Sequence, residues 1–219
     1  MRVVRSIPEV YDWHHPRRWR PHTRYLLLVL LIGISAHTAN ATPLKTLLKA
    51  LNMSVSSSGM VPPQFNTLSS AGRNVSLNSL QGKVVLISFW ATWCRECHAE
   101  MPALEQLHRE LGDHGLSVLG VNFREGAQVI QQYAKELKLT FPLLLDPAGK
   151  IKNSFGVIGL PTTFLIARNG ETIGFAVGPR DWERVPARTI IELLLFESTK
   201  PNAGSTQESP KNRAGAVTQ

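Results

Sequence analysis

An apolar run that leads directly into a pair of cysteines constrains the fold of this chain more than any other feature. The run is VVLISFW, Val84–Trp90, and such a continuous apolar segment is typical of a strand buried on both faces of a sheet. Cys94 and Cys97 follow closely, at the start of a segment whose apolar residues recur at helical spacing as far as Leu111. The pattern therefore predicts a buried strand followed by a cysteine at the amino end of a helix.

Strand and helix patterns alternate along the rest of the folded part. We expect strands at 65–68, 74–77, 83–91, 116–123, 141–145, 162–166 and 172–176, and helices at 94–111, 127–137, 151–155 and from the region of Pro186 to about 196. The first two strands form a hairpin, and the last two are joined by the turn Arg168-Asn169-Gly170. This order predicts an α/β fold with a central mixed sheet flanked by helices.

The first 41 residues have the order of a secretory leader. Arginines precede an apolar run, Tyr25–Ala36, and small residues at Ala39 and Ala41 follow it. This layout is typical of a signal peptide that is cleaved after Ala41. The apolar run is short for a bilayer, which needs about 20 residues, but a retained membrane anchor stays open as the alternative. In either case the basic flank predicts that the rest of the chain lies outside the cytoplasm.

Two further segments have the composition of flexible chain. Residues 42–63 hold a short amphipathic stretch and then SVSSSGMVPP, and we expect a flexible stalk there. Residues 198–219 are polar without apolar periodicity, and we expect a disordered tail. The folded domain is then predicted at 64–197.

The charge of the chain gives little indication of its partners. The formal net charge is +8, and half of this excess belongs to the residues before Thr42. The folded part therefore shows no concentration of basic residues that would indicate binding of nucleic acid.

The position of the two cysteines predicts redox chemistry. A cysteine at a helix N-terminus faces unpaired backbone N–H groups and the positive end of the helix dipole, so the Cys94 thiolate is favoured. Arg95 adds to this effect and Glu96 opposes it. Cys97 lies nearly one turn farther along and deeper, which predicts that Cys94 attacks a partner disulfide and Cys97 resolves the mixed disulfide. A purely structural bridge is disfavoured, because a loop this short stabilises little.

Two segments carry a resemblance to a known superfamily. FWATWCRECHAEMP, with Trp93 before the first cysteine, and GVIGLPTTFLIARNGE resemble the two signatures of the thioredoxin superfamily. The resemblance implies a cis peptide bond before Pro161, and it implies that the backbone at Leu160, Pro161 and Thr162 pairs with an extended substrate segment. The leader, the N-terminal hairpin and the inserted helix–strand unit at 127–145 are similar to the TlpA, ResA and CcmG group of extracytoplasmic thiol-disulfide oxidoreductases.

This resemblance implies a function. We expect a thiol-disulfide oxidoreductase in the bacterial periplasm or on the outer face of the inner membrane, with no cofactor beyond the redox-active disulfide Cys94–Cys97 and no metal. Its partners would be proteins with disulfides or dithiols, and a membrane thiol reductase would supply electrons. In the group, partners include apocytochrome c and copper-site proteins of respiratory assembly, so a role in cytochrome c maturation is implied. A reductase is favoured over a general oxidant.

Glu100 is a further candidate. It lies three residues after Cys97 on the same helical face and matches the acid that follows the dithiol in the group, where it would tune a pKa or carry a proton. A solvated surface glutamate is the alternative. Plain thioredoxins have a buried aspartate in the strand before the dithiol, whereas this chain has Ser88, which puts a proton-accepting role at that position in doubt.

Three other chemistries fit parts of the pattern. Cys94-x-x-Cys97-His98 also matches a covalent haem site, but the chain has no methionine after Met101 as a distant second ligand. A peroxiredoxin would have Pro and Thr where this chain has Ile87 and Ala91. A Cu(I)-binding metallochaperone on the same fold is the main alternative, since exported thiolates bind Cu(I) well, but it would need a third ligand.

Overall fold

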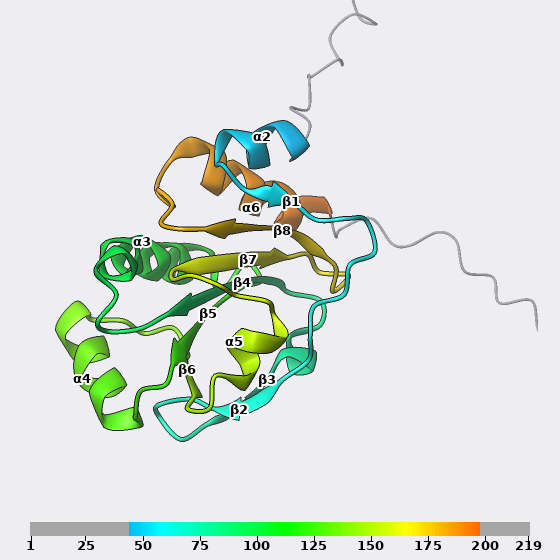
Figure 1. Ribbon diagram of the computed structural model, residues 1–219. Helices are drawn as coiled ribbons and strands as arrows, with labels where there is room; N and C mark the ends of the chain where they lie inside the picture. The colour runs from blue at the N-terminus through cyan, green and yellow to red at the C-terminus, as the bar shows by residue number, and fades with distance from the viewer. Residues whose placement is uncertain (1–43, 198–219) are drawn as a thin grey trace, which may run out of the picture. The chain divides into compact units, whose positions relative to one another are not determined.

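A six-stranded mixed sheet forms the centre of the fold in the computed structural model, which describes residues 44–197 (Figure 1). The strands are β1 Ser54–Val55, β2 Asn66–Leu68, β3 Asn74–Ser76, β4 Val84–Trp90, β5 Leu116–Phe123, β6 Leu143–Asp146, β7 Thr162–Ile166 and β8 Thr172–Val177. The helices are α2 Leu44–Ala50, η1 Leu77–Leu80 (a 3₁₀ helix), α3 Arg95–Leu111, α4 Ala127–Leu137, α5 Lys150–Ser154 and α6 Val185–Glu197. The predicted leader at 1–41 and the predicted tail at 198–219 lie outside the described residues.

The strand order of the large sheet is β1-β8-β7-β4-β5-β6, and β2 and β3 form a separate antiparallel hairpin. β4, β5 and β6 run parallel, whereas β7 is antiparallel to β4 and β8 is antiparallel to β7. The sheet is therefore mixed, as the sequence predicts. All seven residues of β4 are buried, in agreement with its central position and continuous apolar pattern.

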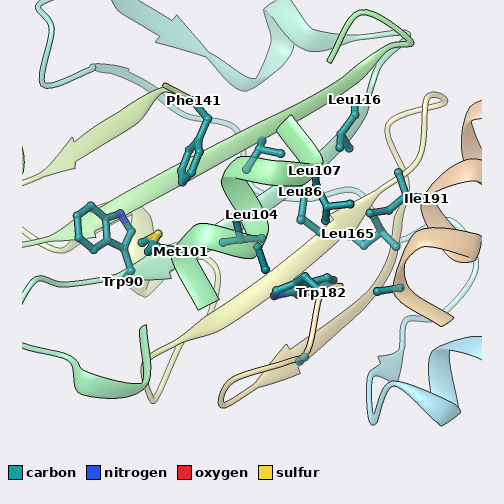
Figure 2. Packing of buried hydrophobic residues seen from close by; sticks show 14 of the residues in the cluster. Leu86, Trp90, Met101, Leu104, Leu107, Leu116, Phe141, Leu165, Trp182 and Ile191 are labelled. Carbon is teal, nitrogen blue, oxygen red and sulfur yellow. The ribbon is translucent and has the colours of Figure 1, made fainter. Parts of the chain in front are cut away.

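Each face of the sheet packs on its own cluster of apolar side chains. Val84, Leu86 and Trp90 of β4 point to the cluster that includes side chains of α2, α3, α4 and α6. Figure 2 shows Leu86 within this cluster, together with Leu104 of α3 and Ile191 of α6. The alternate residues of β4 point to the opposite face, which is covered by η1, α5 and the β2–β3 hairpin. This alternation follows from the side-chain period of two in a strand.

The predicted elements occur where the patterns place them. α4, β5 and β7 have the predicted bounds, and the other predicted helices and strands differ from theirs by at most two residues at either end, apart from α6, for which no exact start is predicted. η1, α2 and β1 are additional. Pro186 is the second residue of α6, at the first turn where a missing N–H costs little.

The expectation of a flexible stalk at 42–63 is wrong for part of this segment. Leu48, Leu51 and Met53 are buried in the main apolar cluster, and α2 packs on α6. β1 pairs with the edge of β8, where a Cβ on Gly174 would come within 2.6 Å of the carbonyl oxygen of Ser54. The amphipathic face of this short helix and the open edge of β8 therefore hold the segment on the domain.

Candidate active site

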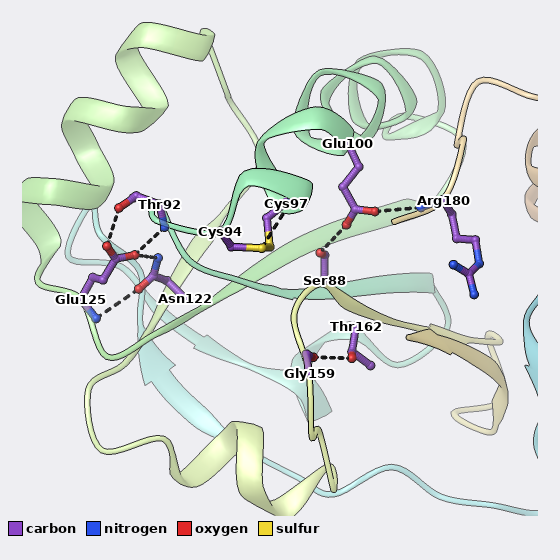
Figure 3. Close-up of a disulfide and its surroundings, with 10 residues drawn as sticks. All are labelled: Ser88, Thr92, Cys94, Cys97, Glu100, Asn122, Glu125, Gly159, Thr162 and Arg180. Atoms are coloured by element: carbon purple, nitrogen blue, oxygen red, sulfur yellow. Dashed lines mark hydrogen bonds between the residues drawn. A yellow bond between two sulfur atoms is a disulfide. The ribbon is translucent and has the colours of Figure 1, made fainter. Parts of the chain in front are cut away.

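Cys94 and Cys97 form a disulfide at the amino end of α3, with an S–S distance of 2.12 Å (Figure 3). Cys94 is the N-cap residue of the helix, and its Sγ accepts a hydrogen bond from the backbone N–H of Cys97 at 3.2 Å. The Cys94 residue is 8% exposed and Cys97 is fully buried. After reduction, the N-terminal N–H groups of α3 would stabilise a thiolate at Cys94, and Cys94 is the sulfur that a partner can reach more easily.

The loop before β7 lies at the same end of the sheet as the disulfide. The Leu160–Pro161 peptide bond is cis, as the resemblance to the thioredoxin superfamily implies. Thr162 pairs with Phe89 near the end of β4, so Pro161 lies beside the point where β4 leads into the cysteine loop. The Oγ1 of Thr162 donates to the carbonyl oxygen of Gly159 at 2.7 Å and holds this loop together (Figure 3). Leu160 packs against the cluster that contains both cysteines.

Glu100, on α3, is buried, and only 3% of it is exposed. Its Oε1 accepts a hydrogen bond from Ser88 Oγ at 3.1 Å. Its Oε2 accepts from the backbone N–H of Arg180 at 3.2 Å and from Nε1 of Trp182 at 3.3 Å. The alternative of a solvated surface glutamate is therefore wrong, because the segment before α6 covers this side chain.

Burial raises the pKa of Glu100 from 4.5 to about 7, and the hydrogen bonds from Arg180, Ser88 and Trp182 oppose this rise only in part. A pocket of about 430 Å³ adjoins Glu100 and opens between α3 and the segment 179–183. A carboxyl group with this pKa exchanges its proton readily near neutral pH. Glu100 and Cys97 lie three residues apart on α3, on the same face.

The residues around the cysteines on the surface are apolar or charged. Trp93 is 67% exposed, and Ile158, in the loop before the cis proline, is 90% exposed. Arg95 and Glu96 are both exposed on the first turn of α3. Trp93 thus lies in the loop after β4, Arg95 and Glu96 lie at the start of α3, and Leu160 and Pro161 lie in the loop before β7.

Two sets of residues at the site are not indicated by the sequence motifs. Arg180 and Trp182 reach Glu100 from a segment some 80 residues later in the chain, and no local pattern signals this contact. Asn122, near the end of β5, donates from Nδ2 to the carboxylate of Glu125 in the loop that follows, and this carboxylate also accepts from Thr92, two residues before Cys94 (Figure 3). A polar pair at the carboxyl end of the strand next to β4 is a signal that could have found them.

The ring of His98 contacts Tyr133 of α4 edge-on, with 5.6 Å between ring centroids. Within residues 44–197 no group of three or more His, Cys, Asp or Glu side chains is placed to hold one metal ion. The third metal ligand that the copper-chaperone alternative needs beside Cys94 and Cys97 is therefore not found within these residues.

A dithiol at a helix N-terminus beside a cis proline, on a mixed sheet of this order, defines a thioredoxin-like thiol-disulfide oxidoreductase. The chain belongs to the AhpC/TSA family, whose model matches residues 59–173. The thiol-disulfide oxidoreductase ResA of Geobacillus thermodenitrificans is 34% identical over 180 residues, which are 81% of this chain and 95% of the relative. The thioredoxin-like protein YneN of Bacillus subtilis is 34% identical over 156 residues, covering 70% and 87% of the two chains.

Solved structures agree with these relatives. A thiol:disulfide interchange protein of the thioredoxin family from Chlorobium tepidum is 26% identical, with a TM-score of 0.58 over 64% of this chain and 99% of that one. StoA from Bacillus subtilis is 28% identical, with a TM-score of 0.51 over 59% and 98% of the chains. The fold and the class of enzyme predicted from the two signatures are thus confirmed.

Proposed function

We propose that this protein is a disulfide reductase of particular partner proteins outside the cytoplasm, with Cys94 as the nucleophile and Cys97 as the resolving thiol. The Cys94 thiolate attacks one sulfur of the partner's disulfide, that S–S bond breaks, and the other partner sulfur leaves as a thiolate. Cys97 then loses its proton and attacks Cys94. The second partner sulfur leaves, the partner is reduced by two electrons, and the Cys94–Cys97 disulfide remains.

The buried carboxyl group of Glu100 is the observation that carries this proposal. Cys97 is fully buried, so water cannot readily take its proton in the resolving step. Glu100 lies one turn along the same helix with a pKa of about 7, and it is suited to accept this proton. The adjoining pocket would let Glu100 return the proton to solvent.

The charges near the dithiol support the reducing direction. An oxidant needs its reduced form stabilised, which means a strongly favoured thiolate. Here the helix N-terminus favours the Cys94 thiolate, but Glu96 in the first turn and Glu100, three residues after Cys97, add acidic groups to the same helix. Arg95 points into solvent, where its charge is screened. These opposing charges support a reducing dithiol.

The compartment and the partners are proposed from the leader and the relatives. The apolar run at 25–36 supports export, with either cleavage or a membrane tether. Within residues 44–197 there is no helix with the length and apolar character needed to cross a membrane. The resemblance to the TlpA, ResA and CcmG group supports a membrane thiol reductase as electron donor and apocytochromes c or other proteins of respiratory assembly as substrates.

Equilibration with dithiothreitol or glutathione buffers, read by a thiol-specific mass tag, tests the direction. We expect a reduction potential more negative than about −220 mV, in the range of reductases. A potential near that of a strong oxidant, about −120 mV, would reverse the direction. A pulse of thiol reagent on rapidly quenched cells tests the redox state of the dithiol in its own compartment. A reductase is expected to be mainly reduced there when its electron donor is present.

The role of Glu100 needs a separate comparison. Glu100→Gln is expected to form the mixed disulfide at the wild-type rate but to resolve it more slowly, with the pH dependence near 7 lost from the resolving step. Glu136→Gln, on the exposed face of α4, is the matched control and is expected to behave as wild type. Equal slowing of both steps in Glu100→Gln would contradict a proton-accepting role.

A further inference from the structure

β4 and β5 end side by side, and the loops that follow them meet. Trp90, the last residue of β4, pairs with Asn122 of β5. The loop after β4 leads to Cys94, and the loop after β5 turns at Arg124, whose φ of 65° is in the left-handed region. This turn directs Glu125 back toward the loop that carries Cys94 (Figure 3).

The carboxylate of Glu125 accepts three hydrogen bonds. Its Oε2 accepts from the backbone N–H of Thr92 and from Nδ2 of Asn122, both at 2.7 Å, and its Oε1 accepts from the hydroxyl group of Thr92. Asn122 is fully buried, and its Oδ1 accepts in turn from the backbone N–H of Glu125 at 3.2 Å. Hydrogen bonds to a carboxylate are stronger than those between neutral groups, so this arrangement fixes Thr92 firmly.

Thr92 belongs to the turn that presents the nucleophile. The backbone N–H of Cys94 donates to the carbonyl oxygen of Ala91 at 3.1 Å, which closes a turn over residues 91–94. Thr92 is held inward by Glu125, while Trp93 at the next position is 67% exposed. The direction of Trp93 and the entry of the chain into α3 at Cys94 both depend on this turn.

The helix that follows Glu125 contacts residues that flank the two cysteines in the sequence. The ring of Tyr133 on α4 contacts two other rings. Its centroid is 4.9 Å from that of Trp90 and 5.6 Å from that of His98. Trp90 ends β4, and His98 comes directly after Cys97. The inserted segment from Glu125 through α4 thus contacts the chain both before Cys94 and after Cys97.

We propose that Glu125 is a positioning residue for disulfide exchange: through Thr92 it holds the 91–94 turn in the conformation that presents Trp93 and Cys94 to a partner. Its charge has a second consequence. A carboxylate fixed beside the loop that carries the nucleophile disfavours a thiolate at Cys94, and so it opposes the helix dipole. Positioning and charge can be separated by variants, because Thr92 contributes only to the first.

The test uses full-length protein with Cys97→Ser, so that Cys94 is the one remaining thiol. The probe is native insulin, whose disulfides are intact. The rate of mixed-disulfide formation is followed against pH, which gives a limiting rate constant and a midpoint for Cys94. Glu125→Gln and Thr92→Val are expected to lower the limiting rate constant by about tenfold, because reaction geometry is lost. Only Glu125→Gln is expected to shift the midpoint, toward lower pH.

Two controls distinguish this role from a merely structural one. Thr92→Ser keeps the hydroxyl donor and is expected to restore a near wild-type rate, and Glu136→Gln on the exposed face of α4 is expected to change neither quantity. Thermal unfolding verifies that each variant is folded at the assay temperature. A wild-type rate and midpoint in Glu125→Gln would overturn the proposal. A Thr92→Ser variant as slow as Thr92→Val, or slowing that merely follows the unfolded fraction, would overturn it as well.

Discussion

Ser88 on β4 and Glu100 on α3 are joined by a hydrogen bond of 3.1 Å between Ser88 Oγ and Glu100 Oε1, and both residues are buried. The strand thus supplies a neutral donor, and the ionisable group comes from the helix that carries the dithiol. Position 88 therefore has no ionisable group, and the buried acid beside it is Glu100.

The Ser88 hydroxyl group is expected to lower the pKa of Glu100. Because a hydrogen bond donated to the carboxylate favours its charged form, Ser88→Ala raises the pKa of Glu100 further above 7. The measurement is a titration of the Glu100 side-chain carboxyl by carbon NMR. Ser79→Ala, at an exposed serine that hydrogen bonds only to the Ser76 carbonyl oxygen, is the control and leaves the titration unchanged. A lowered pKa in Ser88→Ala would contradict the assigned donor.

Glu100 is also expected to make stability depend on pH. Its folded pKa of about 7 lies above the unfolded value of 4.5, so the unfolded state loses its proton first as pH rises. The free energy of unfolding therefore decreases between pH 4.5 and 7 by about 3 kcal/mol from this group alone, and no further above that range. Denaturant unfolding at pH 5 and pH 8 should show this decrease in wild type and its loss in Glu100→Gln. Equal pH dependence in the two proteins would show that Glu100 titrates normally.

Several features of this site can be predicted from the sequence because they are local. The strand β4, the N-cap position of Cys94 and the cis proline are local features, because each depends on a continuous run of residues with one period or one motif. Glu100 is placed on the correct face of α3 by its spacing from Cys97. Its burial could not be predicted, because the covering groups, Arg180 and Trp182, come from a distant segment.

The N-terminal segment shows the same limit of local patterns. α2 has only seven residues, which is too short to be stable alone, and a serine-rich stretch follows it. Its order comes from contacts with α6 and from the pairing of β1 with β8. Such contacts have no signature within the segment itself. The hydrogen bonds between Glu125 and Thr92 could not be predicted for the same reason, since they depend on the pairing of β4 with β5.

The packing of α2 can be tested by a core substitution. Leu48 is 1% exposed, and Leu48→Ala removes buried methyl groups from the main apolar cluster. We expect a loss of about 3 kcal/mol in the free energy of unfolding, measured by chemical denaturation. Lys45→Ala, at an exposed position of the same helix, should change it by less than about 0.5 kcal/mol. Equal, small effects of both substitutions would indicate that 44–50 is not part of the folded core.

Glu105 is expected to have a structural role, in contrast to Glu100. Its carboxylate accepts hydrogen bonds from the backbone N–H and the hydroxyl group of Thr140, both at 2.6 Å, and so ties α3 to the connection before β6. Glu105→Ala leaves these donors unpaired and is expected to lower stability by about 2 kcal/mol. The exposed Glu136→Ala serves as control. Disulfide exchange per folded molecule should stay unchanged, and a selective loss of exchange would assign Glu105 to the reaction instead.

Trapping of a mixed disulfide tests the central claim most directly. Reduced Cys97→Ser protein is mixed with native insulin, whose disulfides are intact. Adducts are separated on a non-reducing gel and mapped by mass spectrometry. Because Cys94 attacks and no resolving thiol is present, we predict a stable adduct through Cys94 that dithiothreitol releases, and none with Cys94→Ser. Absence of an adduct with Cys97→Ser, or an equal yield with Cys94→Ser, would contradict the assignment of Cys94 as the nucleophile.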